Sequence, residues 1–310
     1  MRIVSLLPSA TEIVCALGLE SELVGRSHAC DWPPGIGELP ALTYSTIAAP
    51  DEPLTPREID RRVSDALREG RSLYGLDLEC LLALRPDVII TQALCDVCAV
   101  SRETLEHALG HLARKGGVRL LSLEPVDLQG IWRSIERVAD LLGVADRARM
   151  LLQGIFGRLE RLRCALQGIA HRPRVAALEW LDPPFAPGHW VPEQILLAGG
   201  ECLLGRAGEP SYRTDWETIQ EACPEVLLLM PCGYSLQEVL AEARSLLPRL
   251  CDLGRVSIWA LEANAYFSRP GPRVVEGIEL LAQVLHPERF GEPDPSRARL
   301  LNPIAIGTPP

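Results

Sequence analysis

Short, mainly apolar runs alternate along the chain with segments of helical periodicity. The runs at 88–91 (VIIT) and 226–229 (VLLL) contain no charged residue. A strand of this kind is buried on both faces, because a strand with one wet face alternates apolar and polar side chains. Strands that alternate with helices are typical of parallel sheets covered on both sides. The pattern therefore predicts an α/β protein.

The two halves of the chain repeat one phrase: helix, proline, acidic residue, strand. Pro86 and Pro224, which precede the two runs, stand 138 positions apart (224 − 86). The next predicted strands begin at Val118 and Val256, which are also 138 positions apart (256 − 118). A constant offset across two elements indicates a structural repeat. We therefore expect two Rossmann-like lobes, each with a parallel sheet.

Two helices are predicted between the halves, over about 127–142 and about 145–167. The second would be about 34 Å long at 1.5 Å per residue. A helix resists bending more than a flexible linker does, so we expect it to join the lobes rigidly. The predicted organisation is an N-terminal α/β lobe (1–143), a connecting spine helix (144–168), a C-terminal α/β lobe (169–290) and a loosely attached Pro-rich tail (291–310).

Charge and hydropathy limit the classes of binding partner and the cellular compartments that we expect for this chain. The chain has 310 residues and a net charge of −10, which disfavours nucleic acids and anionic membrane surfaces, because both attract a basic face. No apolar stretch approaches the roughly 18–20 residues of a membrane span, so no direct insertion is expected. We interpret MRIVSLLPSATE as a first strand, not a signal peptide. The prediction is a cytoplasmic location, or a periplasmic or extracellular one only if an upstream export segment was removed.

Aromatic residues are concentrated in the loops that follow the predicted strands. Ligands of open α/β sheets bind beyond the carboxyl ends of the strands, and exposed aromatics there suit a large, partly apolar ligand. The alternative is that each ring plugs a sheet end as core. The aromatic residues in these loops are Trp32, Trp180, Phe185, Trp190, Tyr234, Tyr266 and Phe267.

Arg269 and Arg273 precede the last predicted helix. Guanidinium groups bind carboxylates and phosphates through paired hydrogen bonds, so the two arginines are candidates for holding an anionic group of a ligand. Salt bridges to the sheet-end acids Glu179 or Asp182 are the alternative.

Cys95 and Cys98 stand three apart in the loop after the run at 88–91. Thiolate and imidazole ligands suit zinc, copper or iron, but a structural zinc site usually has two such cysteine pairs. Four interpretations stay open: loop packing, a metal site, a redox pair and contact with an organic ligand. The candidate metal set, for Zn or Fe, is Cys95, Cys98, Cys232, His28 and His189.

Three segments resemble the cobalamin-binding branch of the ABC-transporter substrate-binding proteins, and the resemblance covers about residues 2–288. They are RIVSLLPSATEIVCALG (2–18), GLDLECLLALRPDVII (75–90) and NAYFSRPGPRVVEGIELL (264–281). The resemblance implies two lobes bridged by a long rigid helix, with the ligand between them. The CxVC loop is similar to that of a cytosolic-looking subgroup and departs from the exported members.

Single residues carry the resemblance further. It implies that Trp32 lines a corrinoid cleft, that Phe185 faces the ligand and that Tyr266 takes the place of a rim Trp. It also implies that Glu79 meets an arginine of a membrane permease. The second docking glutamate falls at position 216 or 217, and Trp216 leaves this docking uncertain.

The leading hypothesis is a non-enzymatic, cytoplasmic binding protein for a small molecule, a corrinoid such as cobalamin or a related metal chelate, held between two lobes. The alternative is a cytoplasmic enzyme or carrier that depends on a metal or metal cofactor and uses Cys95 and Cys98. A third hypothesis, a transporter component, requires export. The predicted ligand-binding residues are Trp32, Cys95, Cys98, Trp180, Phe185, Trp190, Tyr234, Tyr266 and Arg269.

Overall fold

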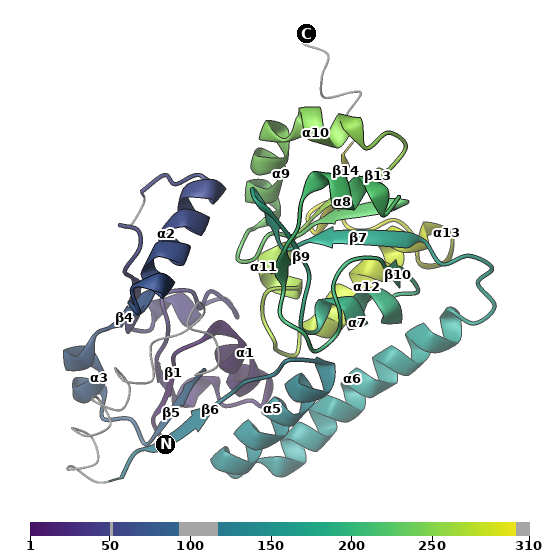
Figure 1. Cartoon of the computed structure of the whole chain (residues 1–310). Helices are drawn as coiled ribbons and strands as arrows, with labels where there is room; N and C mark the ends of the chain where they lie inside the picture. The colour runs from purple at the N-terminus through teal and green to yellow at the C-terminus, as the bar shows by residue number, and fades with distance from the viewer. Residues whose placement is uncertain (50–51, 93–116, 302–310) are drawn as a thin grey trace. The chain divides into compact units, whose positions relative to one another are not determined.

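The computed structural model describes residues 1–49, 52–92 and 117–301. The chain forms two compact units, each described by itself below (Figure 1). Unit 1 consists of Met1–Pro125 and Gly130–Leu152, and unit 2 of Val126–Gln129 and Gln153–Pro310.

Unit 1 is built on a parallel sheet with the strand order β2-β1-β5-β6. Val4 and Ile89 of this sheet pack with Leu6, Leu42 and Leu81 in one buried cluster. The strands are β1 (Ile3–Ser5), β2 (Leu23–Gly25), β5 (Val88–Thr91) and β6 (Arg119–Ser122). Around them lie α1 (Pro8–Ala16), α2 (Pro56–Arg68), α3 (Leu78–Leu84) and the antiparallel pair β3 (Thr43–Ser45) and β4 (Tyr74–Leu76).

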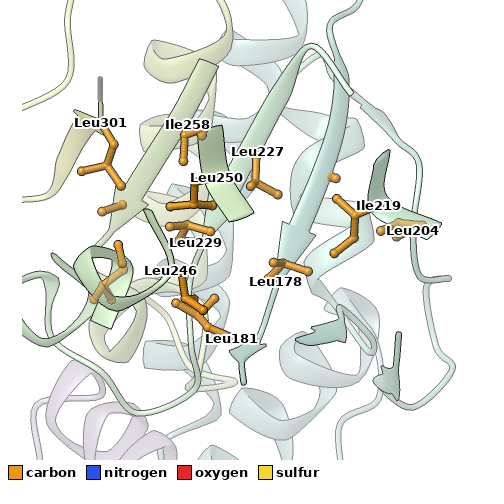
Figure 2. Close-up of a cluster of buried hydrophobic side chains, with 14 of the residues drawn as sticks. Leu178, Leu181, Leu204, Ile219, Leu227, Leu229, Leu246, Leu250, Ile258 and Leu301 are labelled. Carbon is orange, nitrogen blue, oxygen red and sulfur yellow. The ribbon is translucent and has the colours of Figure 1, made fainter. Parts of the chain in front are cut away.

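Unit 2 is built on a five-stranded sheet with the order β10-β7-β12-β13-β14. Its first four strands are parallel and β14 is antiparallel to β13. Figure 2 shows the leucines and isoleucines that fill the core on one side of this sheet, among them Leu178, Leu227 and Ile258. The strands are β7 (Arg174–Leu178), β10 (Glu201–Cys202), β12 (Val226–Leu229), β13 (Ser257–Leu261) and β14 (Ala298–Leu301).

A second, three-stranded antiparallel sheet follows β7, with the order β11-β9-β8. Its strands are β8 (Trp180–Leu181), β9 (Pro184–Ala186) and β11 (Tyr212–Arg213). The helices of unit 2 are α7 (Val191–Leu197), α8 (Trp216–Glu221), α9 (Leu236–Ser245), α10 (Leu247–Asp252), α11 (Ala263–Tyr266), α12 (Val274–Leu285) and α13 (Pro287–Phe290).

The predicted repeat is confirmed by the topology. The order β2-β1-β5-β6 in unit 1 matches β10-β7-β12-β13 in unit 2. The first residues of β5 and β12, Val88 and Val226, are 138 positions apart (226 − 88), as are those of β6 and β13 (257 − 119). The fold is therefore α/β, as the sequence predicts, with a parallel sheet in unit 1 and a mainly parallel sheet in unit 2.

Helices α5 (Leu128–Leu142) and α6 (Ala145–Ala165) lie where two helices are expected. The boundary between the two units falls within α6, between Leu152 and Gln153. The spine's rigidity and the domain limits given above stay predictions. Among the described residues, no helix combines the length and the apolar character that a membrane crossing requires.

The predicted tail differs from the structure at its centre. Ala298–Leu301 forms β14 and pairs with β13, with Ala298 opposite Leu261 and Leu301 opposite Ile258. Both end residues of β14 are buried, whereas Arg299 and Leu300 face outward. That pattern of burial does not alternate, so the sequence carries no signal for a strand here.

Candidate functional site

Near the carboxyl ends of β1 and β2 in unit 1, side-chain hydroxyl groups surround the buried thiol of Cys30. Thr11 Oγ1 donates to Ser5 Oγ at 2.8 Å and lies 3.0 Å from Cys30 Sγ. Ser27 Oγ lies 3.3 Å from the same sulfur. Cys30 is only 2% exposed. This cluster fixes the loop that leads to Trp32 against the first turn of α1.

His28, in the same loop, is held by its neighbours. Its Nδ1 lies 2.7 Å from Thr43 Oγ1, and its ring centre is 5.4 Å from that of Tyr74. Burial lowers the pKa of His28, and the positive charge of Arg26 lowers it further. The imidazole is therefore neutral at neutral pH and joins its loop to β3 and β4.

Trp32 is the exposed aromatic of unit 1's strand-end loops. It is 43% exposed and is followed by a cis Trp32–Pro33 peptide bond. Trp32 stays a predicted ligand contact, and its 43% exposure leaves part of the indole accessible. Cys95 and Cys98 lie outside the described residues.

In unit 2, the small antiparallel sheet places two predicted aromatics side by side. Trp180 and Phe185 are paired across β8 and β9, and both are half-buried. The Arg213 guanidinium lies 5.6 Å from the centre of the Phe185 ring. Tyr234 meets Trp180 edge to face, with ring centres 5.5 Å apart. Three of the predicted ligand-binding residues therefore come together here.

Two glutamates in this part of unit 2, Glu179 and Glu242, have pKa values above the ordinary value of a glutamate. Burial raises the pKa of Glu179 to about 7. Burial, with a smaller contribution from the negative charge of Asp182, raises the pKa of Glu242 to about 7. Both Glu242 oxygens are buried without a hydrogen-bond partner among the described residues, as is Trp180 Nε1. Sequence reasoning missed Glu242, because nothing in the pattern of α9 marks it as buried.

Trp190 and Tyr266 are tied into the structure. Trp190 Nε1 donates to the carbonyl oxygen of Phe267 at 2.9 Å. Tyr266 is 8% exposed. The guanidinium carbons of Arg273 and Arg297 lie 5.9 Å and 5.3 Å from the centre of its ring. These contacts are those of sheet-end packing, and a ligand role for either residue stays a prediction.

Arg269 is also buried, at 6% exposure. Its Nη2 donates to Asn264 Oδ1 at 3.0 Å. Arg269 thus links Asn264, the second residue of α11, to the turn before α12. Its predicted contact with a ligand anion stays a prediction.

Among the described residues, the predicted metal set is represented by His28, His189 and Cys232. No group of three or more His, Cys, Asp and Glu side chains there is arranged to hold a metal ion. Cys232 is exposed, and its backbone N–H donates to the Glu179 carbonyl at 2.9 Å. Burial lowers the pKa of His189, whose φ of 53° is left-handed. Cys95 and Cys98 lie outside the described residues, and His28 belongs to unit 1 whereas His189 and Cys232 belong to unit 2, so the zinc or iron site stays a prediction.

Duplicated α/β units with aromatic side chains at the carboxyl ends of their strands define a class of ligand-binding protein. The chain belongs to the periplasmic binding protein family, whose sequence profile matches residues 3–245.

Relatives and solved structures agree with this assignment. A vitamin B12-binding protein from Vibrio cholerae serotype O1 is 24% identical over 290 residues, covering 92% of this chain and 88% of the relative. One from Photorhabdus laumondii is 22% identical over 289 residues, covering 92% and 88%. A periplasmic heme-binding protein from Pseudomonas aeruginosa matches with a TM-score of 0.70 at 21% identity, covering 97% of this chain and 95% of that one.

The periplasmic vitamin B12-binding protein of Vibrio cholerae has also been solved. It matches with a TM-score of 0.63 at 23% identity, covering 92% of this chain and 96% of that one. Likeness at this level of identity shows the shared two-lobed α/β fold.

The predicted cytoplasmic location is wrong. The family and the similar solved proteins are periplasmic. The prediction rested on the N-terminal apolar run, which the structure places in β1. A run that forms a central strand is explained by the fold and says nothing about the compartment in which the fold works.

Proposed function

We propose that this chain is a non-enzymatic solute-binding protein for a corrinoid or a closely related metal-bearing macrocycle. The observation that carries the proposal is that vitamin B12-binding proteins resemble the chain over about nine-tenths of its length. Heme-binding proteins share its fold. Corrins and hemes are both broad macrocycles around a metal ion, so one ligand shape accounts for both likenesses.

The aromatic side chains supply the surfaces that such a ligand needs. Trp32 is exposed, and Trp180, Phe185 and Tyr234 form a half-buried cluster. Flat rings contact a macrocycle over a large area at little cost in side-chain entropy. We assign these four residues to direct contact. Trp190 and Arg269, and Tyr266 at the end of α11, complete the proposed set.

Cys95 and Cys98 are proposed to contact the ligand from the first lobe. Their rival role, in a metal-dependent enzyme or carrier, has no support in the family or in its relatives. The proposed protein binds its solute without changing it, and the metal in question belongs to the ligand.

Docking to an ABC-type permease is part of the proposal. Glu79 is the second residue of α3, whose N-cap is Asp77. Glu217 is the second residue of α8, whose N-cap is Asp215. Both glutamates are exposed, and they stand 138 positions apart (217 − 79). The helix caps therefore favour Glu217 over Trp216 as the counterpart of Glu79.

The test is a titration of the purified protein with cyanocobalamin and, separately, with hemin, followed by absorbance and calorimetry. We expect one-to-one binding of at least one macrocycle. We also expect Trp32→Ala to weaken it by about tenfold or more, the scale of a lost aromatic contact. Phe156→Ala is the matched control, because Phe156 is similarly exposed, at 47%, on α6.

Two results would overturn the assignment. One is the absence of binding to either macrocycle. The other is an equal loss of affinity in the Trp32→Ala and Phe156→Ala variants. A Cys95→Ser/Cys98→Ser variant, compared with the wild type by its bound-ligand spectrum, then tests whether the two thiols touch the macrocycle.

A further inference from the structure

Unit 2 contains a groove that is lined by none of the residues proposed to contact the macrocycle. It has a volume of about 430 Å³ and runs between the second half of α6 and α12. Four residues of α6 line it at the spacing i, i+3, i+4, i+7 from Arg158, and four of α12 at the same spacing from Glu276. Matched spacing means that one continuous face of each helix borders the groove.

The charges in this groove do not cancel. Arg158 donates to Glu279 through Nε at 2.8 Å and through Nη2 at 2.5 Å. Arg297 lies 3.7 Å from Glu276. Both carboxylates that line the groove are thereby matched with a guanidinium. Arg161 lines the same groove and has no hydrogen bond or ion pair within the described part of the chain. The groove therefore carries one surplus positive charge.

The remaining lining is apolar, with one amide. Leu162 and Leu280 are buried at 6% and 2% exposure and form the floor. Phe290 is half-buried and also lines the groove, as does the half-buried side chain of Gln283. A free guanidinium above leucine and phenylalanine suits a ligand with one anionic end and an apolar body.

We propose that this α6–α12 groove binds a small amphipathic carboxylate. The carboxylate pairs with Arg161, the Gln283 amide offers a further hydrogen bond, and the apolar part of the ligand covers Leu162, Leu280 and Phe290. The volume is within the range of small-molecule sites, about 300–1,000 Å³. The inference is independent of the macrocycle proposed above.

Calorimetric titration of the full chain with octanoate, 1-octanol and octylammonium tests the site. We expect octanoate to bind with a Kd of about 1 mM or tighter. We expect octanol to bind about tenfold more weakly, because it lacks the charge-assisted pair. Octylammonium should not bind measurably, because its charge has the same sign as Arg161.

Arg161→Gln is expected to weaken octanoate binding about tenfold. Arg163→Gln is the matched control, because Arg163 lies on the same helix but pairs with Glu160 at 2.7 Å and does not line the groove. Both residues are exposed, so both variants should keep the thermal midpoint of the wild type. The proposal is overturned if wild type gives no heat with octanoate, if octanol binds as tightly, or if the two variants behave alike.

Discussion

Glu242 shows how burial changes the acidity of a side chain in this protein. Its two oxygens lack a hydrogen-bond partner among the described residues. Burial raises its pKa, the negative charge of Asp182 raises it further, and Glu242 in turn adds to the raised pKa of Tyr234. An ionised carboxylate is poorly accommodated in such a place. The neutral acid is therefore the form that the fold favours, which leads to a prediction about pH.

The pKa of Glu242 rises from 4.5, the ordinary value of a glutamate, to about 7 in the folded protein. The folded protein thus holds a proton that the unfolded chain releases above pH 4.5. The stability that comes from this proton is complete below pH 4.5 and is lost as the pH rises through 7. Glu242→Gln should therefore raise the free energy of unfolding at pH 8 by about 1 to 2 kcal/mol. This is less than the full pKa shift would give, because solvent partly screens the part-buried Glu242.

The measurement is urea unfolding of wild type and variant at pH 5 and pH 8. The two should differ at pH 8 and nearly agree at pH 5. Glu221→Gln, at an exposed position on α8, should leave both midpoints unchanged. An equal shift at both pH values would show that ionisation is not the cause.

At the scale of elements, one glutamine joins three helices of unit 2. Gln194 of α7 is fully buried. Its Nε2 donates to the carbonyl oxygens of Tyr266 at 3.1 Å and Val274 at 2.9 Å. A Cβ at Gly277 would lie 2.7 Å from the Tyr266 oxygen and 2.8 Å from Gln194 Nε2. Gly277 is therefore needed for α12 to approach α7 and α11 this closely.

Gln194→Leu should destabilise unit 2 by about 2 to 3 kcal/mol, because it leaves buried carbonyl groups without their donor. Leu197→Ala on the same helix should change stability by less than about 0.5 kcal/mol, since Leu197 is 41% exposed. Thermal unfolding of both variants measures the difference. Equal midpoints would contradict the joining role of Gln194.

The sequence predicts elements well where one pattern repeats and poorly where packing decides. The runs that became β5 and β12 are apolar throughout, and their constant offset shows the repeat without any coordinates. The packing of Trp190 depends on the Phe267 carbonyl, 77 positions away, and that of Tyr266 depends in part on the distant Arg297. Loop aromatics look alike in a sequence, whether they face a ligand or fill a sheet end.

At the scale of the whole molecule, the main feature is the structural repeat of the two units. Both units have the same strand order, and both have an aspartate-capped helix with an exposed glutamate as its second residue. Membership of the periplasmic binding protein family contradicts the predicted cytoplasmic location. No composition or periodicity in the sequence distinguishes a periplasmic binding protein from a cytoplasmic one of the same fold.

Duplicate glutamates predict additive docking. Glu79→Ala and Glu217→Ala should each reduce permease-dependent uptake of the macrocycle, and the double variant should reduce it further. Macrocycle affinity should stay unchanged, since neither residue lies in the proposed contact set. Uptake into vesicles that contain the permease measures the first effect, and calorimetry the second. Glu209→Ala, also exposed, is the control, and a fall in uptake equal to that of the single variants would refute the docking role.

Strand β14 has a consequence for how the protein is made. It supplies the neighbour on the outer edge of β13, where Trp259 pairs with Leu300 and Ala260 with Arg299 (Figure 1). Residues near the end of the chain therefore complete the sheet of unit 2. During synthesis, β13 leaves the ribosome some 40 residues before its partner (298 − 257). Until Leu301 is available, the backbone of β13 has an open edge, and an open edge pairs readily with other chains.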